Sequence, residues 1–170
     1  MSTPILTTGR LILRPPVVED AQAIANILND WEVTQWLTVV PFPYARADAD
    51  EFFAPLFADD ASNYWLIEIG GEVAGAISLR PDLGFFLAPK VHGKGYMTEA
   101  ARAVLAWHFS KSDDEVVSGY HRGNAASVRV QEKLGFRPTH EVVARKTSTG
   151  EEVTVIKTAL SQADWEAHDV

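Results

Sequence analysis

Apolar and polar residues alternate at period two in several short segments of the chain, a pattern that is typical of β-strands. Residues 10–16 read RLILRPP and predict a strand that ends at its prolines. Residues 64–79 hold two apolar runs around Gly70 and Gly71, a pair that favours the tight turn of a hairpin. Further strands are predicted over residues 82–89 and 115–120, and a last hairpin over residues 139–159.

Helical spacing marks three other segments, in which apolar residues recur every three or four positions. The first covers residues 17–30, the second runs from a glycine-rich turn to about Ser110, and the third covers residues 124–135. Residues 31–65 form an aromatic-rich region that PFPY interrupts, which predicts a loop with one or two short helices.

A length of 170 residues fits one domain with its own core. Strands in series, followed by alternating helices and strands, predict an α+β fold around one mixed sheet over residues 1–170. The sequence shows neither a signal-peptide pattern nor a membrane-spanning run, so we expect a cytoplasmic protein with no membrane partner.

The composition excludes several kinds of chemistry. The chain has no cysteine, which rules out disulfides, thiolate metal sites and a cysteine-linked acyl-enzyme. His92, His108, His140 and His168 lack the spacing of metal ligands, so we expect no metal. The formal net charge of -8 argues against nucleic acid as a partner.

Charge is unevenly distributed along the chain. Acidic residues dominate residues 19–60, where Arg46 is the one Lys or Arg, whereas Lys and Arg outnumber Asp and Glu over residues 90–137. The two regions could serve two ligands, an amine and a phosphate-bearing molecule. Solvated helix faces of arbitrary sign would give the same pattern.

A glycine-rich turn, HGKGYM at residues 92–97, leaves a predicted strand and enters a predicted helix. Gly93 and Gly95 permit positive φ, and a helix N-terminus directs backbone N–H groups to one point, which favours an anion such as phosphate. The P-loop motif does not fit, because Ala88 stands where it requires a glycine and Gly95 where it requires Ser or Thr. The dinucleotide fingerprint does not fit either, because Thr98 stands where it requires a third Gly or Ala. A turn that serves chain geometry alone would have the same composition.

A second motif follows in residues 119–136, which read GYHRGNAASVRVQEKLGF. Asn124 and Ser127, with a Lys-Leu-Gly-Phe ending at Phe136, combine with the glycine turn, whose first motif position holds Lys90. This combination resembles the GNAT superfamily of acetyl-CoA-dependent N-acetyltransferases, and within it the RimJ/RimL branch of ribosomal-protein N-terminal acetyltransferases. The segments TGRLILRP and PFPY also look like this branch, so the resemblance covers nearly the whole chain.

The resemblance implies the GNAT fold, a mixed and mostly antiparallel sheet of roughly six or seven strands with about four helices. Its central parallel strands splay apart at the cofactor. The resemblance also implies acetyl-CoA as co-substrate, with the pyrophosphate on the N–H groups of the turn and the pantetheine along the preceding strand. The implied cofactor contacts are Phe85, Phe86, Leu87, His92, Gly93, Lys94, Gly95, Tyr96, Met97, Thr98, Asn124 and Ser127.

Direct attack of an amine on bound acetyl-CoA is the mechanism that a chain without cysteine favours. Many GNAT members protonate the leaving thiolate from a tyrosine, and Gln131 stands at that place. The resemblance to the RimJ/RimL branch gives this role to Ser127 and lets Asn124 orient the pantetheine or the acceptor. The same two residues also suit the N-cap and first turn of a helix.

Three residues are candidates for the general base: Asp82, Glu68 and His121, of which Asp82 is preferred because it begins the cofactor strand. An ordered water could relay the proton in their place. The resemblance implies that the backbone N–H of Leu87 stabilises the oxyanion. Gly119 fits either a close approach of another group or a bulge.

The acceptor pocket is expected to include Trp36, Phe42 and Tyr44, which lie beside prolines in a loop and can hold a cationic amine through their rings. Phe52, Phe53 and Trp65 are expected in the core. The acceptor could be a protein N-terminus or a small-molecule amine, and a homodimer fits the exposed strands and the C-terminal hairpin.

Two other functions remain open at this point. The chain could be a non-catalytic acyl-CoA-binding module that kept the cofactor turn and lost the chemistry, which the missing tyrosine would suit. It could also be a nucleotide-binding protein unrelated to acetyl transfer, in which case the two motifs co-occur by chance.

Overall fold

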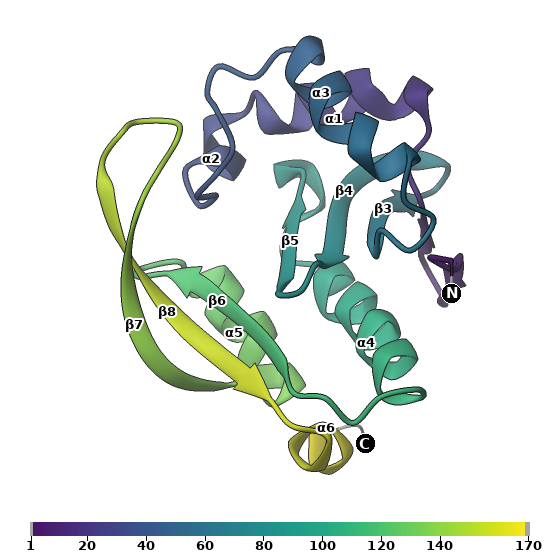
Figure 1. Cartoon of the computed structure of the whole chain (residues 1–170), viewed down its shortest axis with the longest axis vertical. Helices are drawn as coiled ribbons and strands as arrows, with labels where there is room; N and C mark the ends of the chain where they lie inside the picture. Colours follow the sequence, from purple (N-terminus) through teal and green to yellow (C-terminus); the bar gives the residue numbers. More distant parts are fainter. Residues whose placement is uncertain (1, 169–170) are drawn as a thin grey trace.

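A computed structural model describes residues 2–168 as two antiparallel sheets with helices around them (Figure 1). The strands are β1 (Leu6–Thr7), β2 (Ile12–Arg14), β3 (Tyr64–Ile69), β4 (Glu72–Leu79), β5 (Leu83–Leu87), β6 (Val116–His121), β7 (Arg137–Arg145) and β8 (Glu152–Leu160). The helices are α1 (Ala21–Leu28), α2 (Trp31–Thr34), α3 (Arg46–Phe57), α4 (Tyr96–Phe109), α5 (Ala125–Leu134) and α6 (Gln162–His168), with 3-10 turns η1 (Val18–Asp20) and η2 (Pro89–Val91). The α+β class is confirmed. None of the helices in residues 2–168 is long and apolar enough to span a membrane.

The first sheet has the order β1-β2-β3-β4-β5, so β5 is its edge strand. The predicted β3–β4 hairpin is confirmed, and Gly70 and Gly71 in its turn have positive φ angles of 60° and 84°. Positive φ in both central residues is the conformation that two-residue hairpin turns require, which explains the glycine pair.

The second sheet has the order β6-β8-β7, and in the described residues no backbone ladder joins it to β5. The expectation of one mixed sheet is therefore corrected to two antiparallel sheets. Leu83 of β5 and Ser118 of β6 are linked by a side-chain hydrogen bond of 2.7 Å from the Ser118 hydroxyl to the Leu83 carbonyl. Sequence patterns predict strands but do not determine whether two neighbours share a ladder.

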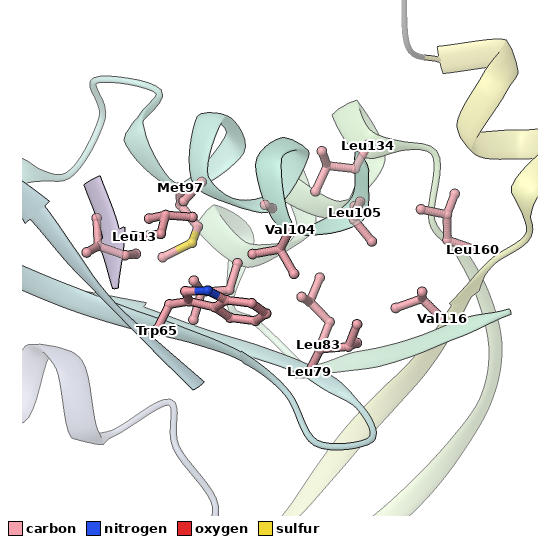
Figure 2. Close-up of a cluster of buried hydrophobic side chains, with 14 of the residues drawn as sticks. Leu13, Trp65, Leu79, Leu83, Met97, Val104, Leu105, Val116, Leu134 and Leu160 are labelled. Carbon is pink, nitrogen blue, oxygen red and sulfur yellow. The ribbon is translucent and has the colours of Figure 1, made fainter. Parts of the chain in front are cut away.

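The largest hydrophobic cluster lies between the sheets and α4 (Figure 2). Trp65 of β3 packs there beneath Val104 and Leu105 of α4, and all three side chains are fully buried. Leu83 of β5 and Val116 of β6 contribute to the same cluster, so the two separate sheets are held together by shared apolar packing.

A second cluster packs α1 and α3 against the first sheet, with Phe53 of α3 fully buried. The expected core positions of Phe53 and Trp65 are confirmed. Phe52 is 45% exposed and packs its ring edge against Tyr64, so its expected core position is wrong. Phe52 and Phe53 are consecutive on one helix and therefore cannot both face the sheet.

Candidate active site

A cleft of about 730 Å³ opens where β5 and β6 separate. Its walls come from residues 32–38, called the α2 segment below, and from β5, the glycine turn, β6, α5 and β8. The cleft thus joins the two regions that sequence motifs single out, the glycine turn and the segment around Asn124.

The glycine turn supplies a row of unused hydrogen-bond donors. In the described part of the chain, no protein acceptor takes a hydrogen bond from the six consecutive backbone N–H groups of Gly93 to Thr98. Gly93 and Gly95 have positive φ angles of 73° and 79°, which a glycine adopts without strain. Since Gly95 precedes the first residue of the 14-residue α4, the positive helix end adds to the attraction for an anion.

Most residues expected at the cofactor do line this cleft: Phe85, Phe86, Leu87, His92, Gly93, Gly95, Tyr96, Met97, Thr98, Asn124 and Ser127. Lys94 differs, because it is not among the residues that line the cleft and its carbonyl accepts a 3.0 Å hydrogen bond from Arg10. The alternation of glycine and lysine in the turn therefore brings the glycine backbone, rather than the lysine ammonium, to the cleft.

The edge of β5 that does not pair with β4 faces the cleft. The Leu83 carbonyl accepts from Ser118, and the Leu87 carbonyl lies 2.8 Å from His92 Nε2. Because backbone groups of alternate residues in a strand point the same way, Phe85 also directs its N–H and C=O away from β4. The Leu87 N–H thus lies on the side where an oxyanion donor is expected, and the edge has main-chain groups for a pantetheine amide.

Asn124 and Ser127 begin α5. The Asn124 side chain caps this helix by accepting from the Ser127 N–H at 3.4 Å, as its N-cap interpretation expects. Both residues also line the cleft. Ser127 as a residue is 8% exposed, and within residues 2–168 its hydroxyl makes no hydrogen bond, so the hydroxyl can interact with a ligand in the cleft.

Arg129 and Lys133 line the same wall, one helical turn apart on α5, and were not singled out from the sequence. Their spacing of four residues, which places two cations on one helix face, was the available signal. With the N–H row of the turn, they give the cofactor end of the cleft a positive character that suits phosphates.

Gln131, at the place of the GNAT tyrosine, is 1% exposed and belongs to a buried polar network. Its Nε2 donates to the Ser118 hydroxyl at 3.1 Å and to the Gly119 carbonyl at 3.0 Å, and its Oε1 accepts from Thr158 at 2.6 Å. The network connects α5, β6 and β8, and through Ser118 it reaches Leu83 of β5. Gln131 therefore fixes the junction of the two sheets.

Residue 119 is a glycine because the neighbouring strand β8 leaves little space for a side chain. A Cβ on this residue would lie 3.0 Å from the Ile156 carbonyl oxygen and 3.2 Å from Val155 Cγ1 of β8. The β6–β8 register is continuous at this position, so the close approach is confirmed and the bulge is excluded. The approaching group is β8.

The three candidate bases differ in their surroundings. Asp82 lines the cleft, but its carboxylate is paired with Lys157 Nζ at 2.8 Å. Glu68 lies outside the lining of the cleft, in an ion pair with Arg14. Both carboxylates therefore already have a cationic partner.

His121 lines the cleft at the end of β6 and is 4% exposed. Its Nε2 lies 2.8 Å from the Thr38 hydroxyl, and its buried Nδ1 has no hydrogen-bond partner in the described residues. Burial lowers the pKa of this imidazole below its usual range, and the positive charge of Lys146 lowers it further, while the nearby Gln35 carbonyl acts in the opposite direction. His121 is therefore neutral at pH 7.

Of the residues expected at the acceptor, Trp36 lies at the cleft and Phe42 does not. Trp36 lines the cleft together with Glu32, Leu37 and Thr38. Phe42 instead packs against Trp31, with ring centroids 5.1 Å apart.

Tyr44 is 6% exposed and belongs to the second hydrophobic cluster, so the expectation that it lines the pocket is wrong. Its backbone N–H donates to the Asn29 side chain at 2.9 Å, which fixes the loop with the ring turned inward. Burial, with a smaller effect of Asp48, raises the pKa of Tyr44 to about 12.

Within residues 2–168, His, Asp and Glu side chains form no group that could hold a metal ion. Two sheets that separate at a cleft, with a row of free N–H groups at a helix N-terminus, fit the class of proteins that bind a phosphate-bearing ligand between their sheets. Residues 10–137 match the acetyltransferase (GNAT) domain family, and the chain belongs to this family. Its members use acetyl-CoA.

Named relatives agree with this assignment. The chain is 26% identical over 141 residues to the uncharacterized N-acetyltransferase YnaD of Bacillus subtilis, covering 78% of this chain and 82% of YnaD. It is 22% identical over 167 residues to the spermidine N(1)-acetyltransferase of Escherichia coli, covering 90% and 87%. The fold resembles RimL, a ribosomal L7/L12 alpha-N-protein acetyltransferase solved with coenzyme A, with a TM-score of 0.78 at 17% identity over 93% and 98% of the two chains.

Proposed function

We propose that the protein transfers the acetyl group of acetyl-CoA to a primary amine by direct attack, in the manner of the RimJ/RimL branch. The observation that carries this proposal is the row of six unpaired N–H groups from Gly93 to Thr98, of which all but Lys94 belong to residues that line the same cleft as Arg129 and Lys133. A pyrophosphate on this row would leave the pantetheine to run along the free edge of β5. RimL, a protein of similar fold, has been solved in complex with coenzyme A, which supports coenzyme A as the ligand.

The reaction needs one group that stabilises the oxyanion formed on the thioester carbonyl and another that protonates the leaving sulfur. The amine nitrogen attacks the thioester carbonyl, the C–N bond forms and the C–S bond breaks. The nitrogen loses one proton to a water in the cleft, and the leaving thiolate takes up one proton. In our proposal the Ser127 hydroxyl donates the proton to the thiolate, since it lines the cleft and has no partner in residues 2–168, and it regains a proton from that water. The Leu87 N–H stabilises the oxyanion. Asp82 is not retained as the base, because Lys157 already pairs with it.

The acceptor end of the cleft favours an amine that carries one positive charge beside an apolar group. Trp36 and Leu37 supply an apolar surface there. Glu32 adds a carboxylate that makes no ion pair in the described residues, whereas the charge of Asp82 is balanced by Lys157. A single free carboxylate suits the N-terminus of a peptide or a small monoamine better than a polyamine.

The test is the release of free thiol from acetyl-CoA in the presence of N-terminal peptides, amino acids, polyamines and other small amines. Turnover is expected with a monoamine or a peptide N-terminus. Gly95→Trp is the blocked control, because a bulky side chain at a φ of 79° strains the turn that holds the phosphates. Turnover restricted to polyamines would contradict the proposed acceptor.

The second candidate function is a non-catalytic acyl-CoA-binding module. It is favoured by one observation: the side chain at the place of the GNAT tyrosine, Gln131, is occupied by three hydrogen bonds of a structural network. Acetyl-CoA binding without turnover on every amine in the panel would support the module and contradict the enzyme proposed above.

A further inference from the structure

Two arginines of the N-terminal segment RLILR make separate sets of contacts. Arg10 reaches the glycine turn and α4, and Arg14 reaches η1 and β3. We propose that Arg10 is a positioning residue for the cofactor, which holds the glycine turn in its anion-binding conformation from the side opposite the cleft. This inference rests on the proposed binding of acetyl-CoA.

Arg10 forms a clamp with Glu99 of α4, 89 residues away in the chain. Its Nε donates to Glu99 Oε1 at 2.9 Å, and its backbone N–H donates to Glu99 Oε2 at 3.2 Å. The Thr8 hydroxyl donates to the same Oε2 at 2.7 Å. Three donors from residues 8–10 therefore converge on one carboxylate in the first turn of α4.

The remaining guanidinium nitrogens of Arg10 lie over the turn itself. Nη1 donates to the Lys94 carbonyl at 3.0 Å, and the guanidinium carbon lies 4.3 Å from the centre of the Tyr96 ring. A Cβ on Gly95 would lie 3.5 Å from Nη2. One planar side chain thus contacts the turn from Lys94 to Tyr96 and the helix at Glu99.

The contact with Lys94 sets the direction of a donor. A trans peptide unit is planar, and its C=O and N–H point in opposite directions. Because Arg10 holds the Lys94 carbonyl on its own side, the N–H of Gly95 in the same peptide unit points away from Arg10. Gly95 lines the cleft and Arg10 does not, so this N–H is directed toward the proposed pyrophosphate.

Charge supports the clamp at neutral pH. Burial acts to raise the pKa of Glu99, but hydrogen bonds from Thr8 and Arg10 and the charge of Arg10 outweigh it and hold the pKa below its usual range. Glu99 is therefore ionised at pH 7. Without Arg10, this carboxylate would remain in the first turn of α4, near the phosphates, with no cation to balance it.

Arg14 is a matched control within the same segment. Its Nη1 and Nη2 donate to Asp20 at 2.8 Å each, and its Nε is paired with Glu68. None of these three residues lines the cleft. Substitution of Arg14 removes an equally well-bonded arginine from the scaffold and leaves the glycine turn untouched.

The experiment compares coenzyme A and pantetheine, which lacks the pyrophosphate, as ligands of the full chain by calorimetry or NMR. Arg10→Ala is expected to weaken coenzyme A binding about tenfold and to leave pantetheine binding unchanged, because charge-assisted hydrogen bonds to the turn are lost. Arg10→Lys keeps the positive charge and the fold but loses the planar fork, so an intermediate loss is expected. Arg14→Ala is expected to lower Tm and to leave both affinities unchanged.

The protection from hydrogen exchange that bound coenzyme A gives to the amides of residues 93–98 is a second readout, which is expected to decrease in Arg10→Ala and not in Arg14→Ala. Equal coenzyme A affinity in Arg10→Ala and the wild type would overturn the clamp, and so would an equal loss in Arg14→Ala. A wild-type protein that binds no coenzyme A would overturn the proposed function and the clamp with it.

Discussion

Ser127→Ala separates the proposed catalytic role of Ser127 from its place in the helix. The cap uses the Ser127 backbone N–H and the Asn124 side chain, so the substitution leaves it intact. We expect kcat to fall about a hundredfold, because the thiolate loses its proton donor, while the Kd of coenzyme A stays within a factor of about two. Steady-state kinetics on the best amine of the panel measure this effect.

The contrasting variant is Asn124→Ala, which removes the cap itself and is expected to lower the free energy of unfolding by about 1 kcal/mol. If Ser127→Ala kept the wild-type kcat, the proton would have to come from another group or from water.

Individual residues differ in how far local sequence predicts their role. Gly93 and Gly95 were predictable because a positive φ is a local requirement that glycine meets at low cost. Tyr44 was not, since its burial depends on Asn29 and on the packing of α1 and α3, which local sequence does not show. The role of Gln131 in a buried network was equally hidden, because its partners lie on β6 and β8.

His121 predicts a pH dependence of stability. In the unfolded chain an imidazole takes up a proton near pH 6.5, whereas the lowered pKa of His121 delays uptake in the folded protein. The unfolded state then binds more protons, so the free energy of unfolding falls as the pH drops through and below about 6.5. Urea denaturation at several pH values should show that the free energy of unfolding of His121→Gln falls less steeply with decreasing pH than that of the wild type. An unchanged decline would mean that another group titrates.

At the scale of elements, the position of β5 depends on one glycine of its neighbour. Gly75 of β4 pairs with Leu87, and a Cβ on Gly75 would lie 2.2 Å from the Phe86 carbonyl oxygen. The sequence predicted β4 and β5 with nearly correct bounds, because their apolar runs are clear. It did not reveal this close approach, because an interior glycine gives no indication of what lies opposite.

Gly75→Ala is expected to push β5 away from β4 and to lower the free energy of unfolding by about 2 kcal/mol. Coenzyme A binding should weaken as well, since the displaced strand carries Phe85 and Leu87 on the cleft wall. Gly9→Ala is the control, because no atom lies within 4 Å of a Cβ at that position. Similar stability and affinity in the two variants would show that β4 adapts without moving β5.

At the scale of the molecule, the β7–β8 hairpin reaches the α2 segment, whose residues Gln35 and Thr38 line the cleft (Figure 1). The Thr147 N–H at the hairpin tip donates to the Thr38 carbonyl at 2.8 Å, and Lys146 Nζ donates to the Gln35 carbonyl at 3.4 Å. His121 holds Thr38 from the end of β6. The hairpin was predicted from sequence, but its contact more than one hundred residues away was not, because alternation describes a strand and not where its turn docks.

Thr147→Pro removes the N–H that docks the hairpin and should raise the KM of the acceptor several-fold, since the wall around Trp36 and Thr38 loses a support. Thr147→Ala keeps the N–H and is expected to behave like the wild type. The Kd of coenzyme A should not change in either variant. Equal acceptor KM values for Thr147→Pro and Thr147→Ala would show that the docking is unimportant for the acceptor.

The hydrogen bond from Ser118 to the Leu83 carbonyl has a consequence for how the cleft changes its width. The two walls belong to different sheets, so they can move apart without breaking a backbone ladder in either sheet. Widening the cleft costs a side-chain hydrogen bond and some apolar contact, a far smaller disruption than unzipping two paired strands. We therefore expect this framework to accommodate thioesters bulkier than acetyl after a few substitutions along the free edges of β5 and β6, with both sheets left intact.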